Sequence, residues 1–319
     1  MTFAALFPGQ GSQSVGMLSD LAASHPQVRE TFAEASEALG YELWALVQEG
    51  PEERLAKTER TQPAMLAAGV AVWRCWAAND GPDPVIAAGH SLGEYSALAA
   101  FGSIEFSDAV RIVAARGRFM QEAVPEGEGG IAAILGLKDE EVVSLCAQIC
   151  REPSSGHVSA VNFNSPGQVA IAGDIETLER AMEAMRAAGA KKIVRLPMSV
   201  PVHCPLMAPA SQRLEERLAA IDLRPPKVSI LHNADLLERS DPSAIRKALV
   251  DQLTRPVQWS RCISSMAERG ARTMIEFGPG RVLAGLARRI DRDLQVSAVH
   301  DARSLEKALE AIQRFLSDG

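Results

Sequence analysis

The stretch that decides the fold is PVIAAGHSLGEYSALAAF, residues 84–101. A short apolar run leads into the turn GHSLG, and a helical pattern follows. In a G-x-S-x-G turn between a strand and a helix, glycines at Gly89 and Gly93 leave room for the crossing backbone. Ser91 is therefore either an exposed nucleophile or, in a plain glycine-rich turn, a helix cap. The first free amides of the helix, including that of Leu92, would face an oxyanion formed at this serine.

Composition limits the class of protein. The 319 residues suffice for one large domain, or for a large domain with an insertion. A net charge of -7 argues against a general nucleic-acid binder. Without a signal-peptide pattern or a run of about 18 apolar residues, we expect a cytoplasmic protein that does not enter a membrane. The five cysteines lack zinc-binding spacings, so we expect reduced thiols and no metal site.

The amino-terminal loop also invites a functional interpretation. Apolar residues 3–7 predict a strand that runs into the loop PGQGSQ. A dinucleotide-binding loop would need glycine where Ser14 stands, so we reject a nucleotide site. The loop is either a plain turn or one whose backbone, at Gln10, lies close to the chemistry. A helix is predicted over residues 62–78, with Thr61 as its cap.

A later helix carries an arginine on its apolar side. Ser107 is its expected cap, and Met120 belongs to its apolar stripe. Arg116 lies on the same stripe. A buried guanidinium needs an anionic partner, because burying an unpaired charge is costly. The partner is either an internal Asp or Glu or a substrate carboxylate held in a bidentate fork.

The pattern changes after the glycine-rich residues 127–130, which we interpret as a hinge. The predicted elements that follow are a strand at 131–137, a helix at 139–150, strands at 157–163 and 168–172, a helix at 175–188 and a strand at 191–196. This βαββαβ order is that of a ferredoxin-like unit. We therefore predict an α/β protein with a large domain, residues 1–127 and 198–319, and an inserted small domain, residues 128–197. Asn162 lies between the middle strands, where it either caps a turn or reaches into a cleft.

Two features of the rest of the chain stand out. His203 is held by prolines in SVPVHCPLM, at the junction of the two predicted domains, where clefts form. His90, beside Ser91, is expected to point away from it. Arg281, Arg288, Arg289 and Arg292 form a basic cluster in an acidic protein. That cluster is either a solvated face or a docking surface for an acidic partner.

Eight motifs together resemble those of malonyl-CoA:acyl carrier protein transacylases, in the same order along nearly the entire chain. They are PGQGSQ, TQPA, GHSLGEYSALAA, RGRFMQEAVP, NFNSPGQVAIAG, SVPVHCPLM, RPVQW and EFGPGRVL. The resemblance implies a hydrolase-like α/β core with a parallel sheet, an inserted ferredoxin-like domain and an active site between them. It also implies a monomer without a bound cofactor, which transfers malonyl from malonyl-CoA to the phosphopantetheine thiol of holo acyl carrier protein for fatty acid synthesis.

The resemblance assigns the reacting groups residue by residue. It implies Ser91 as the nucleophile and His203 as the base. The family has no triad carboxylate, and the backbone carbonyl of Gln252 is implied to orient the base. The backbone amides of Gln10 and Leu92 are implied as the oxyanion hole.

The resemblance also assigns the acyl site. Arg116 is implied to pair with the malonyl carboxylate, while Met120, Asn162, His203 and Gln62 line the cleft. Relatives commonly have serine where this chain has Val202, in a neighbourhood that polyketide acyltransferases use to grade extender units. We therefore expect altered tolerance for branched malonyl groups.

Three other functions stay open at this point. The first two are a free-standing polyketide acyltransferase and an acyl-thioester hydrolase on the same scaffold. The third, a carrier-binding module without chemistry, is disfavoured because Ser91, His203 and Arg116 occur together. Of the basic cluster, Arg281, Arg288 and Arg289 are the candidate docking face for the acidic carrier. The segment LHNADLL departs from the family pattern around Asn233.

Overall fold

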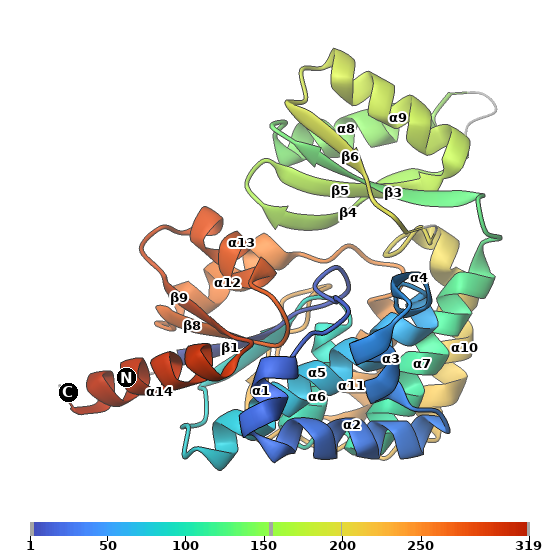
Figure 1. The fold of residues 1–319 in the computed structure, drawn as a ribbon. Helices are drawn as coiled ribbons and strands as arrows, with labels where there is room; N and C mark the ends of the chain where they lie inside the picture. The colour runs from blue at the N-terminus through green and yellow to red at the C-terminus, as the bar shows by residue number, and fades with distance from the viewer. Residues whose placement is uncertain (1–2, 153–155, 199, 318–319) are drawn as a thin grey trace.

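The computed structural model describes residues 3–152, 156–198 and 200–317, and it contains two sheets (Figure 1). Sheet A has the strand order β7 (Ser229–Ile230), β2 (Ile86–Gly89), β1 (Phe3–Phe7), β8 (Thr273–Phe277) and β9 (Gln295–Val299). All of its strand pairs are parallel. The predicted α/β fold with a parallel sheet is therefore confirmed.

Helices cover both faces of sheet A, as buried parallel strands require. The helices between β1 and β2 are α1 (Ser19–Ser24), α2 (Pro26–Leu39), α3 (Leu43–Glu49), α4 (Glu52–Leu55) and α5 (Thr58–Ala78). Those between β2 and the small sheet are α6 (Gly93–Ala100) and α7 (Phe106–Ala123). The later ones are α10 (Ala208–Ala219), preceded by the 3-10 turn Pro205–Met207, α11 (Pro242–Asp251), α12 (Trp259–Glu268), α13 (Val282–Ile290) and α14 (Ala302–Ser317). None of the helices in the described part of the chain has the length and apolar character needed to cross a bilayer.

The central strand β1 divides the core in two. Ala5 and Phe7 pack into an apolar core shared with α2, α5 and α7. Ala4 and Leu6 pack into a second core shared with α12 and α13. Successive strand side chains point to opposite faces, so the run FAALF must be apolar throughout.

Sheet B is antiparallel, with the order β4 (Val158–Ser165), β5 (Gln168–Asp174), β3 (Gly129–Leu135) and β6 (Lys192–Arg195). Helices α8 (Asp139–Cys150) and α9 (Ile175–Ala187) cover its outer face, and its other face is turned toward the large part of the molecule (Figure 1). These elements follow the predicted βαββαβ order within residues 128–197. The domain boundaries themselves stay a prediction.

Two predicted helix caps are wrong. Thr61 lies inside α5, which begins at Thr58, and its hydroxyl donates to the carbonyl of Leu55 at 2.6 Å. Ser107 is the second residue of α7, after Glu105, which caps the helix without a side-chain hydrogen bond. A hydroxyl residue near a helix start fits a cap in sequence, but packing against neighbouring elements decides where the helix begins.

Strand register brings the functional loops together. Phe7 pairs with Gly89, and Leu6 pairs with Glu276, so β1, β2 and β8 end at one edge of sheet A. The loops PGQGSQ, GHSLG and EFGPG leave from that edge. In open α/β sheets, ligands bind beyond the carboxyl ends of the strands.

Candidate active site

The turn after β2 is a tight nucleophile elbow. Ser91 has φ 51°, in the left-handed region that non-glycine residues rarely adopt. A Cβ added at Gly89 would lie 1.9 Å from the carbonyl carbon of Gly93. A Cβ added at Gly93 would lie 2.1 Å from the carbonyl oxygen of Phe7. Only glycine at both positions lets the strand and α6 approach this closely, and the strained serine is thereby raised into the cavity.

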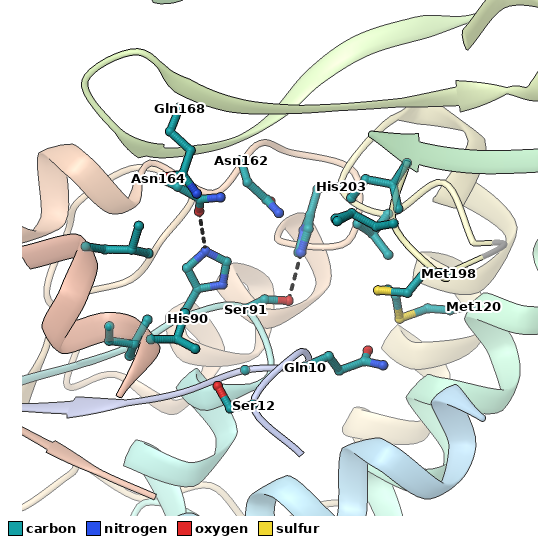
Figure 2. Close-up of a pocket in the computed structure, with 17 residues that line it drawn as sticks. Gln10, Ser12, His90, Ser91, Met120, Asn162, Asn164, Gln168, Met198 and His203 are labelled. Atoms are coloured by element: carbon teal, nitrogen blue, oxygen red, sulfur yellow. Dashed lines mark hydrogen bonds between the residues drawn. The ribbon is translucent and has the colours of Figure 1, made fainter. Parts of the chain in front are cut away.

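Ser91, His203 and Gln252 form a hydrogen-bonded line. Ser91 Oγ lies 2.8 Å from His203 Nε2 (Figure 2). His203 Nδ1 lies 2.8 Å from the backbone carbonyl oxygen of Gln252, so Nδ1–H donates and Nε2 is left to accept. Burial lowers the pKa of His203 to about 3, and the nearby charge of Arg116 acts in the same direction. At neutral pH the ring is uncharged and can accept the serine proton.

The predicted oxyanion donors stand at the start of α6 and in the loop after β1. Among the described residues, the backbone N–H groups of Gln10 and Leu92 have no hydrogen-bond partner. The N–H of Ser91 itself donates to Asn233 Oδ1 at 2.6 Å and is not available. Gln10 lines the cavity, whereas Leu92 is buried. Their role as the oxyanion hole remains a prediction.

Arg116 lies directly behind the serine and is completely buried. Its Nη2 donates to Ser91 Oγ at 3.2 Å and to the side-chain oxygen of Gln252 at 3.0 Å. Its Nη1 donates to the side-chain oxygen of Gln62 at 2.9 Å. Within the described part of the chain its partners are thus two amides and a hydroxyl, not a carboxylate. Burial lowers the pKa of Arg116, while Tyr95 and Glu94 oppose that shift.

A cavity of about 160 Å³ opens above Ser91 between the two sheets (Figure 2). Its lining residues are Gly9, Gln10, Ser12, His90, Ser91, Met120, Ile131, Asn162, Asn164, Gln168, Leu196, Met198, Val202, His203, Val282, Leu283 and Leu286. Met120, Asn162 and Val202 are therefore where the resemblance puts them. Gln62 is not: it is fully buried and lies beside Arg116, so its expected place in the lining is wrong.

The structure confirms one expectation about a cavity residue, the direction of His90, and revises another, the place of Asn162. His90 Nε2 lies 2.8 Å from Asn164 Oδ1, and the ring points toward Asn164 rather than toward Ser91 Oγ, yet it lines the same cavity (Figure 2). Asn162 belongs to β4 rather than to a turn, at a register shift beside Ala160. The bulge aims its side chain into the cavity. Ser199 of the SVPVHCPLM motif lies outside the described residues.

Sequence reasoning missed a set of polar residues beneath the elbow. Glu94, His232 and Asn233 are all buried, and the side chain of Asn233 also donates to the carbonyl of Gly89 at 2.7 Å. The signal that could have found Glu94 is its place in a helix otherwise made of small and apolar residues, EYSALAA. A charge in such a helix needs buried partners.

The basic cluster is divided between two places. Arg281 and Arg288 border a surface hollow of about 380 Å³ together with Arg303 and Lys307. Arg289 instead donates to the side-chain oxygen of Gln168 at 2.8 Å, at the cavity wall. The arrangement gives a basic rim at α13 rather than a single flat face.

Fold and site define the class of protein. A strained serine on a strand-to-helix elbow, beside a buried neutral histidine, is typical of α/β enzymes that form acyl-serine intermediates. Residues 4–313 match the acyl transferase domain family. The chain belongs to the malonyl-CoA:acyl carrier protein transacylase family and is an acyltransferase.

Individual relatives agree with that assignment. The malonyl CoA-acyl carrier protein transacylases of Salmonella typhimurium and Escherichia coli are each 54% identical to this chain, over 96% and 97% of it and 98% and 99% of their own lengths. The solved structure of the transacylase of the same name from Coxiella burnetii has a TM-score of 0.95 at 46% identity and covers 97% of both chains. A malonyl-transacylase solved in complex with its type II PKS acyl-carrier protein has a TM-score of 0.95 at 51% identity, over 98% of this chain and 100% of its own.

Proposed function

We propose that this chain transfers malonyl from malonyl-CoA to the phosphopantetheine thiol of holo acyl carrier protein, through a malonyl ester on Ser91. The observation that carries the proposal is the line from Ser91 Oγ to His203 Nε2 and from His203 Nδ1 to the carbonyl of Gln252, with both distances 2.8 Å. The names of the relatives, all malonyl transacylases, favour the same acyl group.

In the first half-reaction, His203 Nε2 takes the hydroxyl proton while Ser91 Oγ attacks the thioester carbonyl carbon. The carbonyl π electrons move to the oxygen, which we assign to the backbone amides of Gln10 and Leu92. Collapse of this intermediate breaks the C–S bond, and His203 returns the proton to the departing CoA thiolate. Malonyl-Ser91 and free CoA result.

In the second half-reaction the carrier's thiol is the nucleophile. His203 takes the thiol proton as sulfur attacks the ester carbonyl of malonyl-Ser91. Breakage of the C–O bond gives the proton back to Ser91 and leaves malonyl on the phosphopantetheine arm. Each half-reaction restores the neutral ring, so no bound cofactor is needed.

Arg116 is proposed to select a carboxylated acyl group. Its Nη2 lies 3.2 Å from Ser91 Oγ, within the reach of a short acyl group attached there. A malonyl carboxylate would give the buried guanidinium an anionic partner, whereas an acetyl group would not. Val202, which also lines the cavity, is proposed to restrict or permit branched malonyl groups.

The carrier, the pathway and the assembly remain proposals. Arg281 and Arg288 are proposed to meet the acidic carrier, with Arg289 nearer the cavity. The relative solved with a type II PKS carrier keeps a polyketide role as the second candidate. Fatty acid synthesis, a monomeric state and a place in the cytoplasm are predictions carried over from the sequence.

Intact-protein mass spectrometry with malonyl-CoA, without any carrier, tests the proposed function. We expect a malonyl adduct on the wild type that is absent from Ser91→Ala and is discharged by holo acyl carrier protein. Steady release of CoA without an adduct would identify a hydrolase. Neither adduct nor release would contradict the proposed acyl group. Discharge rates with a fatty acid carrier and a polyketide carrier then separate the two pathways.

A further inference from the structure

A polar network lies buried beneath the elbow, outside the cavity. Glu94 on α6, His232 and Asn233 after β7, and Gln252 after α11 are each no more than 1% exposed. Glu94 is the carboxylate of this group. Removing a carboxylate from water is costly unless hydrogen-bond donors surround it, so its contacts are informative.

Three donors surround the Glu94 carboxylate. His232 Nδ1 donates to Oε1, and Gln252 Nε2 donates to Oε2. The backbone N–H of Asn233 also points at Oε2, at 3.4 Å. His232 Nε2 has no partner in the described part of the chain, so the hydrogen bond to Glu94 is what orients this imidazole ring.

Gln252 connects this carboxylate to the reacting groups. Its Nε2 also donates to the carbonyl oxygen of Ser91 at 3.1 Å. Its side-chain oxygen accepts from Arg116 Nη2 at 3.0 Å, and its backbone carbonyl accepts from His203 Nδ1 at 2.8 Å. One residue thus touches the nucleophile's backbone, the base and the arginine.

The two ends of the Gln252 amide face opposite charges. The NH₂ group faces the Glu94 carboxylate, and the oxygen faces the Arg116 guanidinium. Turning the amide over would aim donors at the guanidinium and an acceptor at the carboxylate. Glu94, together with the carbonyl oxygen of Ser91, therefore holds the amide in the one orientation that satisfies Arg116. Glu94 and Arg116 are thus linked through the Gln252 amide and do not contact each other.

We propose that Glu94 is a positioning residue that acts through Gln252, keeping the amide oxygen on Arg116 and the backbone carbonyl on His203. By aligning Arg116, Glu94 contributes to the preference for a carboxylated acyl group. The statement about acyl preference rests on the proposed function, whereas the statement about Gln252 does not.

The first test is Glu94→Gln. An amide at position 94 removes the negative charge that faces the Gln252 NH₂ group and leaves one acceptor oxygen in place of two, so the hold on Gln252 weakens. We expect the ratio of kcat/KM for malonyl-CoA to that for acetyl-CoA to fall about 10-fold, with a higher KM for malonyl-CoA. Partial unfolding alone would lower kcat for both substrates equally and leave the ratio unchanged, and that result would overturn the proposal.

Glu276→Gln is the matched control. Glu276 is also fully buried, and its carboxylate accepts from the backbone N–H groups of Leu283 and Ala284 at 3.1 and 2.8 Å. We expect this substitution to lower the melting temperature without changing the malonyl to acetyl ratio. An equal change of the ratio in both variants would assign the effect to loss of any buried carboxylate, against the proposal.

A second background tests whether Glu94 acts through Gln252. Gln252→Ala keeps the backbone carbonyl but removes the amide. If Glu94 acts through that amide, adding Glu94→Gln to Gln252→Ala should change the ratio by less than about two-fold. A full additional loss, equal to that in the wild-type background, would mean that Glu94 acts by another route.

A crystal structure of Glu94→Gln separates this proposal from the proposed function. If the wild type forms no malonyl adduct on Ser91, the proposed function has failed, yet the structure still reports on positioning. Loss of the contact between Arg116 Nη2 and the Gln252 amide oxygen would support the role of Glu94. Retention of that contact, with His203 Nδ1 unmoved, would overturn it.

Discussion

The two walls of the cavity are built differently. On the wall beside the large sheet, Ser91 and His203 hydrogen-bond to partners that the protein itself supplies, and so does Arg116 directly behind Ser91. On the wall formed by the small sheet, the amides Asn162, Asn164 and Gln168 lie beside apolar side chains such as Ile131 and Met198, and Asn162 Oδ1 is buried without a partner in the described part of the chain.

The difference separates chemistry from fit. Groups that must stabilise developing charge work best when they are already fixed in place. A wall with unsatisfied polar atoms and flexible side chains such as Met198 can instead adjust to the substrate. Substitutions on the first wall should therefore lower the rate of chemistry, and those on the second should change substrate affinity.

The largest effect is expected for His203→Ala. Without a base at Nε2, the rate of Ser91 malonylation should fall by about 10²- to 10⁴-fold. Rapid-quench mass spectrometry measures this rate directly, with circular dichroism as the check on folding. A loss of only a few-fold would show that the wall of the large sheet does not supply the base.

Arg116→Ala should come next. The substitution removes the proposed partner of the malonyl carboxylate. We therefore expect kcat/KM for malonyl-CoA to fall about 100-fold or more, and kcat/KM for acetyl-CoA to fall far less. Parallel kinetics with the two acyl-CoA substrates measure the difference. Equal losses on both substrates would remove Arg116 from acyl selection.

Asn162→Ala probes the opposite wall. If the unpartnered amide meets the substrate, one hydrogen bond is lost, and KM for malonyl-CoA should rise about 3- to 10-fold with kcat nearly unchanged. Steady-state kinetics at saturating carrier separate the two parameters. A large fall in kcat instead would show that chemistry is not confined to the wall of the large sheet.

Arg281→Glu tests the basic rim outside both walls. Repulsion from an acidic carrier should raise the carrier's apparent KM about three-fold at low ionic strength, and the effect should fade in high salt. Arg186→Glu, on the outer helix α9, is the matched charge reversal and should have no effect. Identical behaviour of the two variants would argue against docking at α13.

The smallest effect is expected from pH. Since burial lowers the pKa of His203 to about 3, the folded ring stays neutral well below the pKa of an ordinary histidine. The malonylation rate should therefore change by less than about two-fold between about pH 7.5 and 5.5. A fall in rate with a midpoint near pH 6.5 in rapid-quench data would contradict this assignment.

The same shift has a consequence for stability. Below about pH 6.5, His203 is protonated in the unfolded chain but stays neutral in the folded chain, because its pKa is lower in the folded state. The free energy of unfolding therefore decreases as pH falls. Burial also lowers the pKa of His90, which acts in the same direction. Burial raises the pKa of Glu276 to about 7, which opposes the trend because the folded state binds that proton more tightly.

Much of this architecture was predictable from local sequence. The run FAALF, the GHSLG turn and the βαββαβ order all depend on short-range rules: apolar runs, glycines at close crossings and alternating periodicities. The resemblance of the motifs also predicted roles for Ser91, His203 and Gln252, and the structure shows that these three residues contact one another. Helix starts at Thr58 and Phe106 were misjudged because local cap signals are weak beside tertiary packing.

What the sequence alone determined is the set of elements and the reacting residue types, because these follow from neighbours along the chain. Only the tertiary structure decided which polar groups meet. Gln62 was expected in the cavity lining but lies beside Arg116, to which it is hydrogen-bonded. Glu94 is hydrogen-bonded to Gln252, which lies 158 residues away in the sequence. Contacts between such distant positions depend on how sheets and helices pack, and a buried charge takes whichever partners that packing brings within hydrogen-bonding distance.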